Sequence, residues 1–163
     1  MVHRRRTRHA LDAPRAIMAN KYMSVAKDFI KMCATNKAFA QAAGAGRATA
    51  VHVEEGRLKV ELEVREEMTN PFGTLHGGCT ATLIDVFTTG ALLCTERGAP
   101  GVSVDLHVSY MAAAKAGEIL VLDSVVAKQG KSMAFTKADV YRKSDNVLVA
   151  TGLHTKAFPQ IKS

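Results

Sequence analysis

A pair of glycines and a single carboxylate stand in one stretch of small and apolar residues. The stretch runs from His76 to about Cys94, and Asp85 is the only ionised side chain between them. Its composition predicts a helix that starts at Gly77 and Gly78, is apolar on nearly all faces and is therefore buried. The first N–H groups of a helix have no intrahelical partner, and glycine admits close approach. The Gly77 amide is therefore suited to polarise a carbonyl or to hold a developing oxyanion.

Asp85 has two interpretations, because an acid among apolar neighbours is costly unless it is paired or useful. Backbone or hydroxyl donors could satisfy it, or it could act as a general base for water. Eight residues separate it from Gly77, which is roughly 12 Å along a helix, too far for one water to touch both. If both serve one reaction, the carboxylate comes from a second protomer. The sequence therefore predicts an obligate dimer with sites at the interface.

Three further residues have alternative interpretations. His76 either makes a local hydrogen bond at the helix start or contacts the substrate. Ser103 stands two residues before Asp105 on a predicted strand, so we expect the two side chains to share a face. Ser103 either orients a water or is a strand residue that packs or faces solvent. Cys79 is interpreted as a buried structural thiol rather than a nucleophile, because no histidine base is positioned for it.

Several lysines fall near the ends of predicted strands. They are either solvated turn residues or a cluster that binds the phosphate groups of a nucleotide-like ligand. These lysines are Lys115, Lys128, Lys131 and Lys156.

The histidines and cysteines do not have the spacing of a metal site. Three histidines are dispersed singly and are interpreted as strand residues: His52, His107 and His154. Cys33, Cys79 and Cys94 form no C-x-x-C pair and leave one cysteine unpaired. We therefore expect no metal, no zinc finger and no disulfide framework, and a reducing compartment is favoured.

The hydrophobic periodicity predicts the elements that position these residues. Residues 13–43 have helical spacing, 48–53 and 58–64 alternate as a hairpin, and residues 69–73 form a loop. After the central helix, strands are expected at about 102–110, 119–128, 132–142 and 147–156. An apolar helix must be covered, and a six-stranded antiparallel sheet that curls around it does so. This is an α+β hotdog fold, and pairing of sheet edges between two copies would protect an exposed edge.

The net charge of +7 is concentrated at the start of the chain, where the first 20 residues hold five arginines and one aspartate. This extension is interpreted as a disordered tail, a mitochondrial transit peptide or a basic arm that touches nucleic acid or membrane. The body of the chain is only mildly basic and has no tryptophan, so we expect no nucleic-acid partner for it. No uninterrupted apolar run reaches the ~18 residues of a transmembrane segment.

One long stretch resembles the signature of hotdog-fold acyl-coenzyme A thioesterases. It comprises Thr69-Asn70, then Gly73-Thr74-Leu75-His76-Gly77-Gly78, then Thr80 to Asp85. Further likeness lies in 91–105, 109–111, 128–131 and 154–156, so the resemblance covers about residues 47–156. It implies a dimer of dimers that hydrolyses medium- to long-chain fatty acyl-coenzyme A without a metal or cofactor.

The resemblance also implies roles for individual residues. The Gly77 N–H, with Asn70 nearby, would hold the thioester carbonyl, and His76 would lie beside it. Asp85 would be the general base and Ser103 would help to orient the water. The expected coenzyme A contacts are Tyr110, Met111, Lys115, Lys128, Gln129, Gly130, Lys131, Ser132 and Met133.

Two other functions are weighed against the thioesterase. A hotdog protein that binds acyl-coenzyme A without hydrolysis would not need Asp85. A hydratase or dehydratase would pair its aspartate with a nearby histidine at a shorter spacing than that of His76 and Asp85. We expect a basic extension over 1–20, a helical segment over 21–46 and a hotdog domain over 47–158, in a cytoplasmic or mitochondrial protein.

Overall fold

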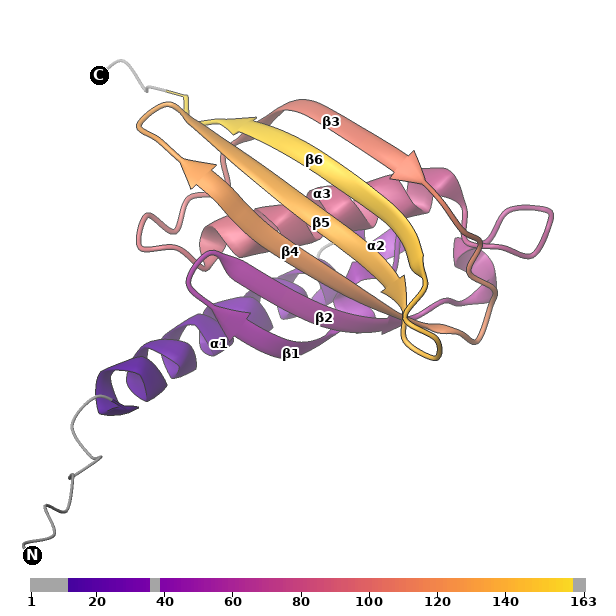
Figure 1. The fold of residues 1–163 in the computed structure, drawn as a ribbon, viewed down its shortest axis with the longest axis horizontal. Coiled ribbons are helices and arrows are strands. Elements are labelled where there is room, and N and C mark those ends of the chain that lie inside the picture. Colours follow the sequence, from indigo (N-terminus) through magenta and orange to yellow (C-terminus); the bar gives the residue numbers. More distant parts are fainter. Residues whose placement is uncertain (1–11, 36–38, 160–163) are drawn as a thin grey trace, which may run out of the picture.

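The computed structural model describes residues 12–35 and 39–159. Residues 1–11 of the expected basic extension lie outside the described residues, whereas its residues 12–20 already belong to a helix, so the helical segment begins before the expected residue 21. The described residues form three α-helices and one six-stranded sheet, whose arrangement Figure 1 shows. The helices are α1 (Asp12–Thr35), α2 (Phe39–Ala42) and α3 (Gly77–Leu93). The strands are β1 (Thr49–Glu54), β2 (Arg57–Glu63), β3 (Val102–Tyr110), β4 (Ile119–Gln129), β5 (Met133–Arg142) and β6 (Leu148–Ala157). These bounds confirm the predicted elements to within a few residues.

The sheet has the order β1-β2-β4-β5-β6-β3, with every neighbouring pair antiparallel. Among the described residues, β3, the last strand in this order, pairs only with β6. The helix α3 lies across one face of the sheet, and α1 contacts both β1 and α3 on that side (Figure 1). This arrangement confirms the expected hotdog fold.

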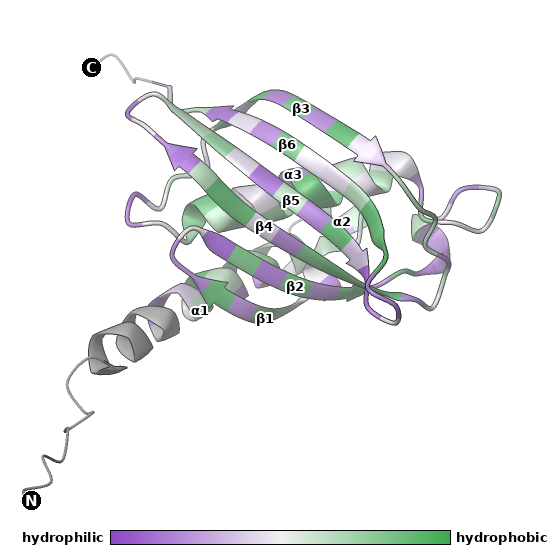
Figure 2. Cartoon of the chain, viewed as in Figure 1, coloured by the Kyte–Doolittle hydropathy of each residue, from purple (hydrophilic) through white to green (hydrophobic). Residues whose placement is uncertain are grey.

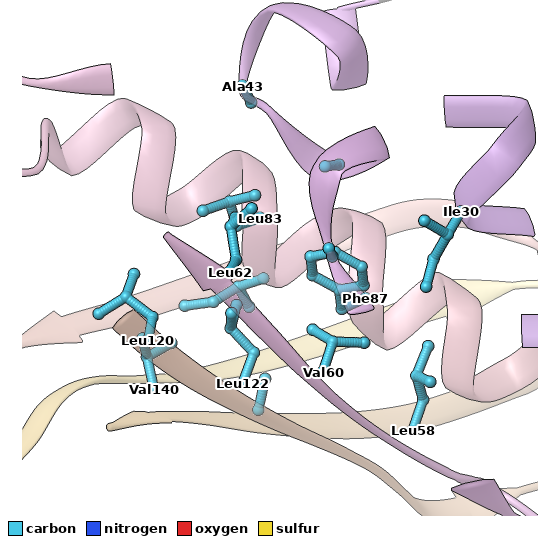
Figure 3. Packing of buried hydrophobic residues seen from close by; sticks show 14 of the residues in the cluster. Ile30, Ala43, Leu58, Val60, Leu62, Leu83, Phe87, Leu120, Leu122 and Val140 are labelled. Atoms are coloured by element: carbon cyan, nitrogen blue, oxygen red, sulfur yellow. The ribbon is translucent and has the colours of Figure 1, made fainter. Parts of the chain in front are cut away.

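Apolar and polar residues alternate along β2 and β3, as the stripes in Figure 2 show, whereas β4 begins with four successive apolar residues, Ile119 to Leu122. The apolar side chains of β2 and β4 point toward α3 and meet Leu83 and Phe87, which are fully buried (Figure 3). Gly90 lets α3 approach closely, because a Cβ there would lie 2.7 Å from Leu58 Cδ2. The core thus fixes the rotation of α3 against the sheet.

The outer face of α3 corrects the expectation of a helix that is buried all round. Its side chains are only half-buried, including those of Thr82, Asp85 and Val86. The sheet covers one face of the helix, while α1 and α2 cover part of the other. The edge strand β3 is also exposed, with 57% of Val104 accessible and Val102 and Leu106 open as well. The described chain therefore leaves apolar surface along its β3 edge.

Candidate functional site

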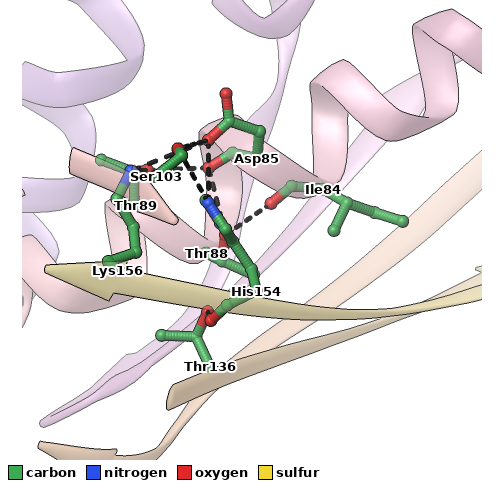
Figure 4. A network of polar contacts seen from close by, with 8 residues as sticks. All are labelled: Ile84, Asp85, Thr88, Thr89, Ser103, Thr136, His154 and Lys156. Carbon is green, nitrogen blue, oxygen red and sulfur yellow. Dashed lines mark hydrogen bonds and ion pairs between the residues drawn. The ribbon is translucent and has the colours of Figure 1, made fainter. Parts of the chain in front are cut away.

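Asp85 lies at the middle of α3 and points toward β3 and β6, as Figure 4 shows. Its Oδ1 atom lies 3.4 Å from Ser103 Oγ, 3.5 Å from His154 Nε2 and 3.7 Å from Lys156 Nζ. The Asp85 side chain is 44% exposed. The expected burial of this carboxylate is therefore wrong, because this side of α3 is only partly covered. The sheet supplies its three polar neighbours. We call these four residues the Asp85 half-site.

The His154 ring contacts the Ser103 hydroxyl and lies between Ser103 and Thr88 (Figure 4). Its Nδ1 lies 2.7 Å from Thr88 Oγ1, and its Nε2 lies 2.9 Å from Ser103 Oγ. Thr88 already donates its hydroxyl hydrogen to the carbonyl of Ile84, at 2.7 Å, so it accepts from His154 Nδ1–H. His154 Nε2 is then the acceptor of the Ser103 hydroxyl hydrogen. This leaves the lone pairs of Ser103 Oγ free to accept a hydrogen bond from water.

Burial keeps His154 in the neutral form that this arrangement needs. The ring is fully buried, and desolvation lowers its pKa from the ordinary 6.5; the nearby Lys156 ammonium acts in the same direction, while the Asp85 and Asp105 carboxylates oppose the shift without reversing it. Sequence reasoning identified His154 only as a strand residue, which it is, and missed its place beneath the carboxylate. The signal was a histidine and a lysine two residues apart on one strand, which share a face.

Lys156 is not a solvated turn lysine, which is one of the two interpretations of the lysines near strand ends. Its side chain is only 5% exposed, and Nζ donates to Thr89 Oγ1 at 2.8 Å. Burial lowers its pKa, and the neighbouring Asp85 carboxylate opposes that shift. The register explains the burial: Lys156 pairs with Ser103 on β3 and Ala134 on β5, and thus faces α3 with them.

A β-bulge overturns the expected shared face of Ser103 and Asp105. Ser103 pairs with Lys156 whereas Asp105 pairs with Thr155, so two residues of β3 advance against one residue of β6. Successive residues of β6 point to opposite faces, and Asp105 therefore does not share the face of Ser103. The bulge leaves Ser103 as the β3 side chain that meets Asp85.

The start of α3 forms a second site, the Gly77 half-site, made of His76, Gly77 and Tyr110. His76 caps the helix, and its Nδ1 accepts a hydrogen bond from the Gly78 N–H at 2.9 Å. This is the local interpretation of His76. Tyr110 Oη donates to the Gly77 carbonyl at 3.0 Å. The Gly77 N–H makes no hydrogen bond to any residue in 12–35 or 39–159, so it is available to a ligand.

Asn70 shapes the loop before α3. Its Oδ1 accepts from the Phe72 N–H at 2.9 Å, and its Nδ2 donates to Thr74 Oγ1 at 2.9 Å. These bonds form an Asx turn that leads the chain into the helix start. Within one protomer the Asn70 amide thus acts on its own loop.

Cys79 has the properties of a structural thiol. Burial raises its pKa to about 11, and Sγ lies 3.6 Å from the Ala43 carbonyl. A thiol with that pKa carries almost no thiolate at neutral pH. All three cysteines are free, and no group of three possible metal-ligating side chains occurs among the described residues. Within that same part of the chain, no helix has the length and hydropathy of a membrane span.

The two expected coenzyme A segments lie at opposite ends of the sheet. Tyr110 pairs with Ala150, whereas Met133 pairs with Ala157, which also pairs with Val102. The length of β3 separates these ends by roughly 26 Å. Tyr110, Met111 and Lys115 are therefore far from the turn that holds Lys128, Gln129, Gly130, Lys131, Ser132 and Met133 within one protomer.

A cavity of about 400 Å³ opens beside the Asp85 half-site. Its lining is Phe29, Met32, Cys33, Ala40, Asp85, Val86, Thr89, Gly101, Val102, Ser103 and Lys156. This volume falls in the range of small-molecule sites. The carboxylate, the hydroxyl and the ammonium thus stand at one wall of a space that a substrate could enter.

The chain is similar in sequence and in fold to known proteins. A model of the thioesterase superfamily matches residues 72–149. Human acyl-coenzyme A thioesterase 13 is 54% identical over 111 residues, 68% of this chain and 79% of the human protein. The crystal structure of zebrafish thioesterase superfamily member 2 has a TM-score of 0.80 at 39% identity, covering 84% of this chain and 98% of the other. The mouse structure of the same name has a TM-score of 0.72 at 39% identity, covering 87% and 98%. The matched range 72–149 contains Gly77, Asp85 and Ser103.

Proposed function

The chain belongs to the thioesterase superfamily, which makes it a thioester hydrolase, and we propose that it hydrolyses medium- to long-chain fatty acyl-coenzyme A. The products are the free fatty acid and coenzyme A. The observation that carries the proposal is the Asp85 carboxylate beside Ser103 at the wall of a largely apolar cavity. A carboxylate in that position can take a proton from water while the acyl group occupies the cavity.

In the proposed reaction, water attacks the carbonyl carbon of the thioester. Asp85 accepts one water proton, and Ser103 Oγ accepts a hydrogen bond from the other, because His154 takes the hydrogen of Ser103. The carbonyl oxygen gains negative charge and is stabilised by a Gly77 N–H. Collapse of the tetrahedral intermediate breaks the carbon–sulfur bond, and the coenzyme A sulfur leaves with the proton that Asp85 took up.

Within one chain, the Gly77 N–H lies eight residues from Asp85, roughly 12 Å along α3, too far to act on the same thioester. Antiparallel pairing of two β3 edges would bring the Gly77 N–H of the partner subunit to Asp85. A self-pairing centred near Leu106 sets Ser103 opposite Ser109 of the partner subunit, and Val102 opposite Tyr110 of the partner subunit. Because Ser103 belongs to the Asp85 half-site and Tyr110 to the Gly77 half-site, each half-site then lies beside the other half-site of its partner. The exposed apolar side chains of β3 support this interface. We therefore propose a dimer as the active unit, within a dimer of dimers.

The same pairing unites the two coenzyme A segments. The 128–133 turn lies at the Val102 end of β3, and the partner's 110–115 segment arrives at that end. Arg97 holds the turn in place, since its Nη1 donates to the carbonyls of Gly130 and Lys131 at 3.1 and 2.9 Å. We propose that Lys128 and Lys131 of one subunit and Lys115 of the partner subunit face the phosphates of one coenzyme A. Asn70 and His76 would approach the thioester with Gly77.

Steady-state hydrolysis of acyl-coenzyme A, followed by release of free thiol, tests the proposal. We expect turnover that is lost when Asp85 is replaced. We also expect the protein to sediment as a dimer or a tetramer. Binding of acyl-coenzyme A without turnover would instead identify a sensor or carrier, and addition of water across an enoyl-coenzyme A double bond would identify a hydratase. We further propose a cytoplasmic or mitochondrial location, which expression of the full chain with a C-terminal fluorescent tag tests.

A further inference from the structure

We propose that α1 is part of the substrate site and binds the distal end of the fatty acyl chain, an inference that rests on the proposed function. The cavity beside Asp85 has two unlike walls. Asp85, Ser103 and Lys156 form the polar wall. The part of the lining that α1 and α2 contribute, which we call the apolar wall, consists of Phe29, Met32, Cys33 and Ala40. An acyl chain whose thioester is held at the polar wall must extend along the apolar one.

The chemistry of the lining favours an aliphatic chain over a polar ligand. Asp85 and Lys156 are the only charged side chains that line the cavity among the described residues, and both belong to the half-site. No polar group of α1 or α2 lines it apart from the Cys33 thiol, which is buried and whose pKa burial raises. A methylene chain needs no hydrogen-bond partner, and its transfer from water to such a wall is favourable.

Met32 is the residue of α1 that a bound chain would cover. It is 48% exposed, whereas its neighbours on the same helix face, Phe29 and Cys33, are buried. A large apolar side chain left open beside a cavity gains by burial against a ligand. Methionine is also flexible enough to fit chains of different length.

This placement makes α1 a determinant of chain length. Each methylene that reaches the apolar wall improves binding about fourfold, until the chain passes the end of the cavity. A bulky side chain at position 32 shortens the usable cavity, and a small one lengthens it. Short acyl groups, which stay near Asp85, do not sense the change.

The test compares turnover across saturated acyl-coenzyme A substrates from butanoyl to palmitoyl. For Met32→Trp we expect kcat/KM to fall at least about tenfold on the longest chains and to stay within about twofold on butanoyl-coenzyme A. Met32→Ala should move the preferred length upward. Lys31→Trp adds the same ring at an exposed neighbouring position of α1 that does not line this cavity, and should leave the profile unchanged.

A second measurement separates this inference from the proposed function. Equilibrium binding of the same series to Asp85→Ala and to Asp85→Ala/Met32→Trp reports chain-length dependence without turnover. A wild-type chain without hydrolysis would overturn the proposed function alone. Equal chain-length profiles in the wild-type protein, Met32→Trp and Met32→Ala, in turnover or in binding, would overturn the role of α1. A cooperative thermal unfolding transition is the criterion that a variant is folded. If Met32→Trp does not fold, Met32→Ala alone provides the test.

Discussion

The two ends of α3 carry the two half-sites, and they are built in opposite ways. The Gly77 half-site is mainly local: His76 caps the helix through Gly78, Asn70 organises the preceding loop, and only Tyr110 comes from elsewhere. The Asp85 half-site is assembled over long sequence separations, because its other members come from β3 and β6. One site is a property of a short segment, and the other is a property of the sheet.

This difference explains how each half-site should respond to mutation. The local site presents a backbone N–H, which a change of side chain alone does not remove. The distant site presents side chains whose positions depend on the register of β3 against β6 and on the bulge at Ser103. The predicted variants below act on one end of α3 at a time.

The largest effect is expected at Asp85. Asp85→Asn keeps the shape of the side chain and removes the base, so kcat should fall about 10²–10⁴-fold. Because the carboxylate is half-exposed, the fold should persist, and affinity for coenzyme A should not change. Thiol release and equilibrium binding measure the two quantities. Near-normal turnover in Asp85→Asn would show that the base lies elsewhere.

At the other end, Gly77→Pro removes a single N–H. Gly77 is the first residue of α3, where proline is well tolerated, and His76 already has the extended backbone, with ψ of 134°, that proline requires of its predecessor. We expect a loss of about 10²–10³-fold in kcat with the helix intact. Gly77→Ala is the control: it keeps the N–H, and its Cβ would make an ordinary 3.5 Å contact with the Tyr110 ring. Equal losses in both variants would contradict a role for the amide.

Mixing the two variants tests whether the half-sites meet across a dimer. A mixed dimer of Asp85→Asn and Gly77→Pro subunits has one site that lacks both groups and one site that retains both. Activity should therefore recover to about half that of the wild-type dimer, per mixed dimer formed. If both groups acted within one chain, mixing would restore nothing.

The sequence predicted the helix start at Gly77 and the fold better than the contacts around Asp85, for the same physical reason. Neighbouring residues determine helix starts, turns and the alternation along strands. The helix α3, the β1–β2 hairpin and the last four strands therefore lie where the pattern predicted them. The burial of Lys156 and the contact of His154 with Ser103 depend on strand register over long separations. The bulge that separates Ser103 from Asp105 could not be predicted from the alternation of apolar and polar residues, because a bulge interrupts that two-residue period.

Ser103→Ala should have a smaller effect than either variant above. It removes the oxygen that accepts a hydrogen bond from the attacking water and leaves Asp85 in place. The net value of one hydrogen bond corresponds to a loss in kcat of up to about tenfold, with KM unchanged. Val104→Ala is the matched control, because Val104 lies on the same strand but is exposed and does not contact Asp85. Its kcat, measured on the dimer, should equal that of the wild-type protein. A loss in Ser103→Ala as large as that of Asp85→Asn would mean that Ser103 does more than orient water.

The smallest effect is a pH dependence of stability that originates at His154. Its pKa in the folded protein is lowered by burial, so below about pH 6.5 the unfolded chain binds a proton that the folded chain does not. The contribution of His154 to the free energy of unfolding should therefore be fully present above about pH 6.5. It should be lost as the pH falls from there toward the pKa of His154 in the folded protein. His154→Gln removes the titrating group, and its melting temperature should decline less over that window. His52→Gln, at an exposed histidine on β1, should keep the wild-type slope. If His154→Gln instead kept that slope and His52→Gln flattened it, the neutral buried ring beneath Ser103 would not be the source.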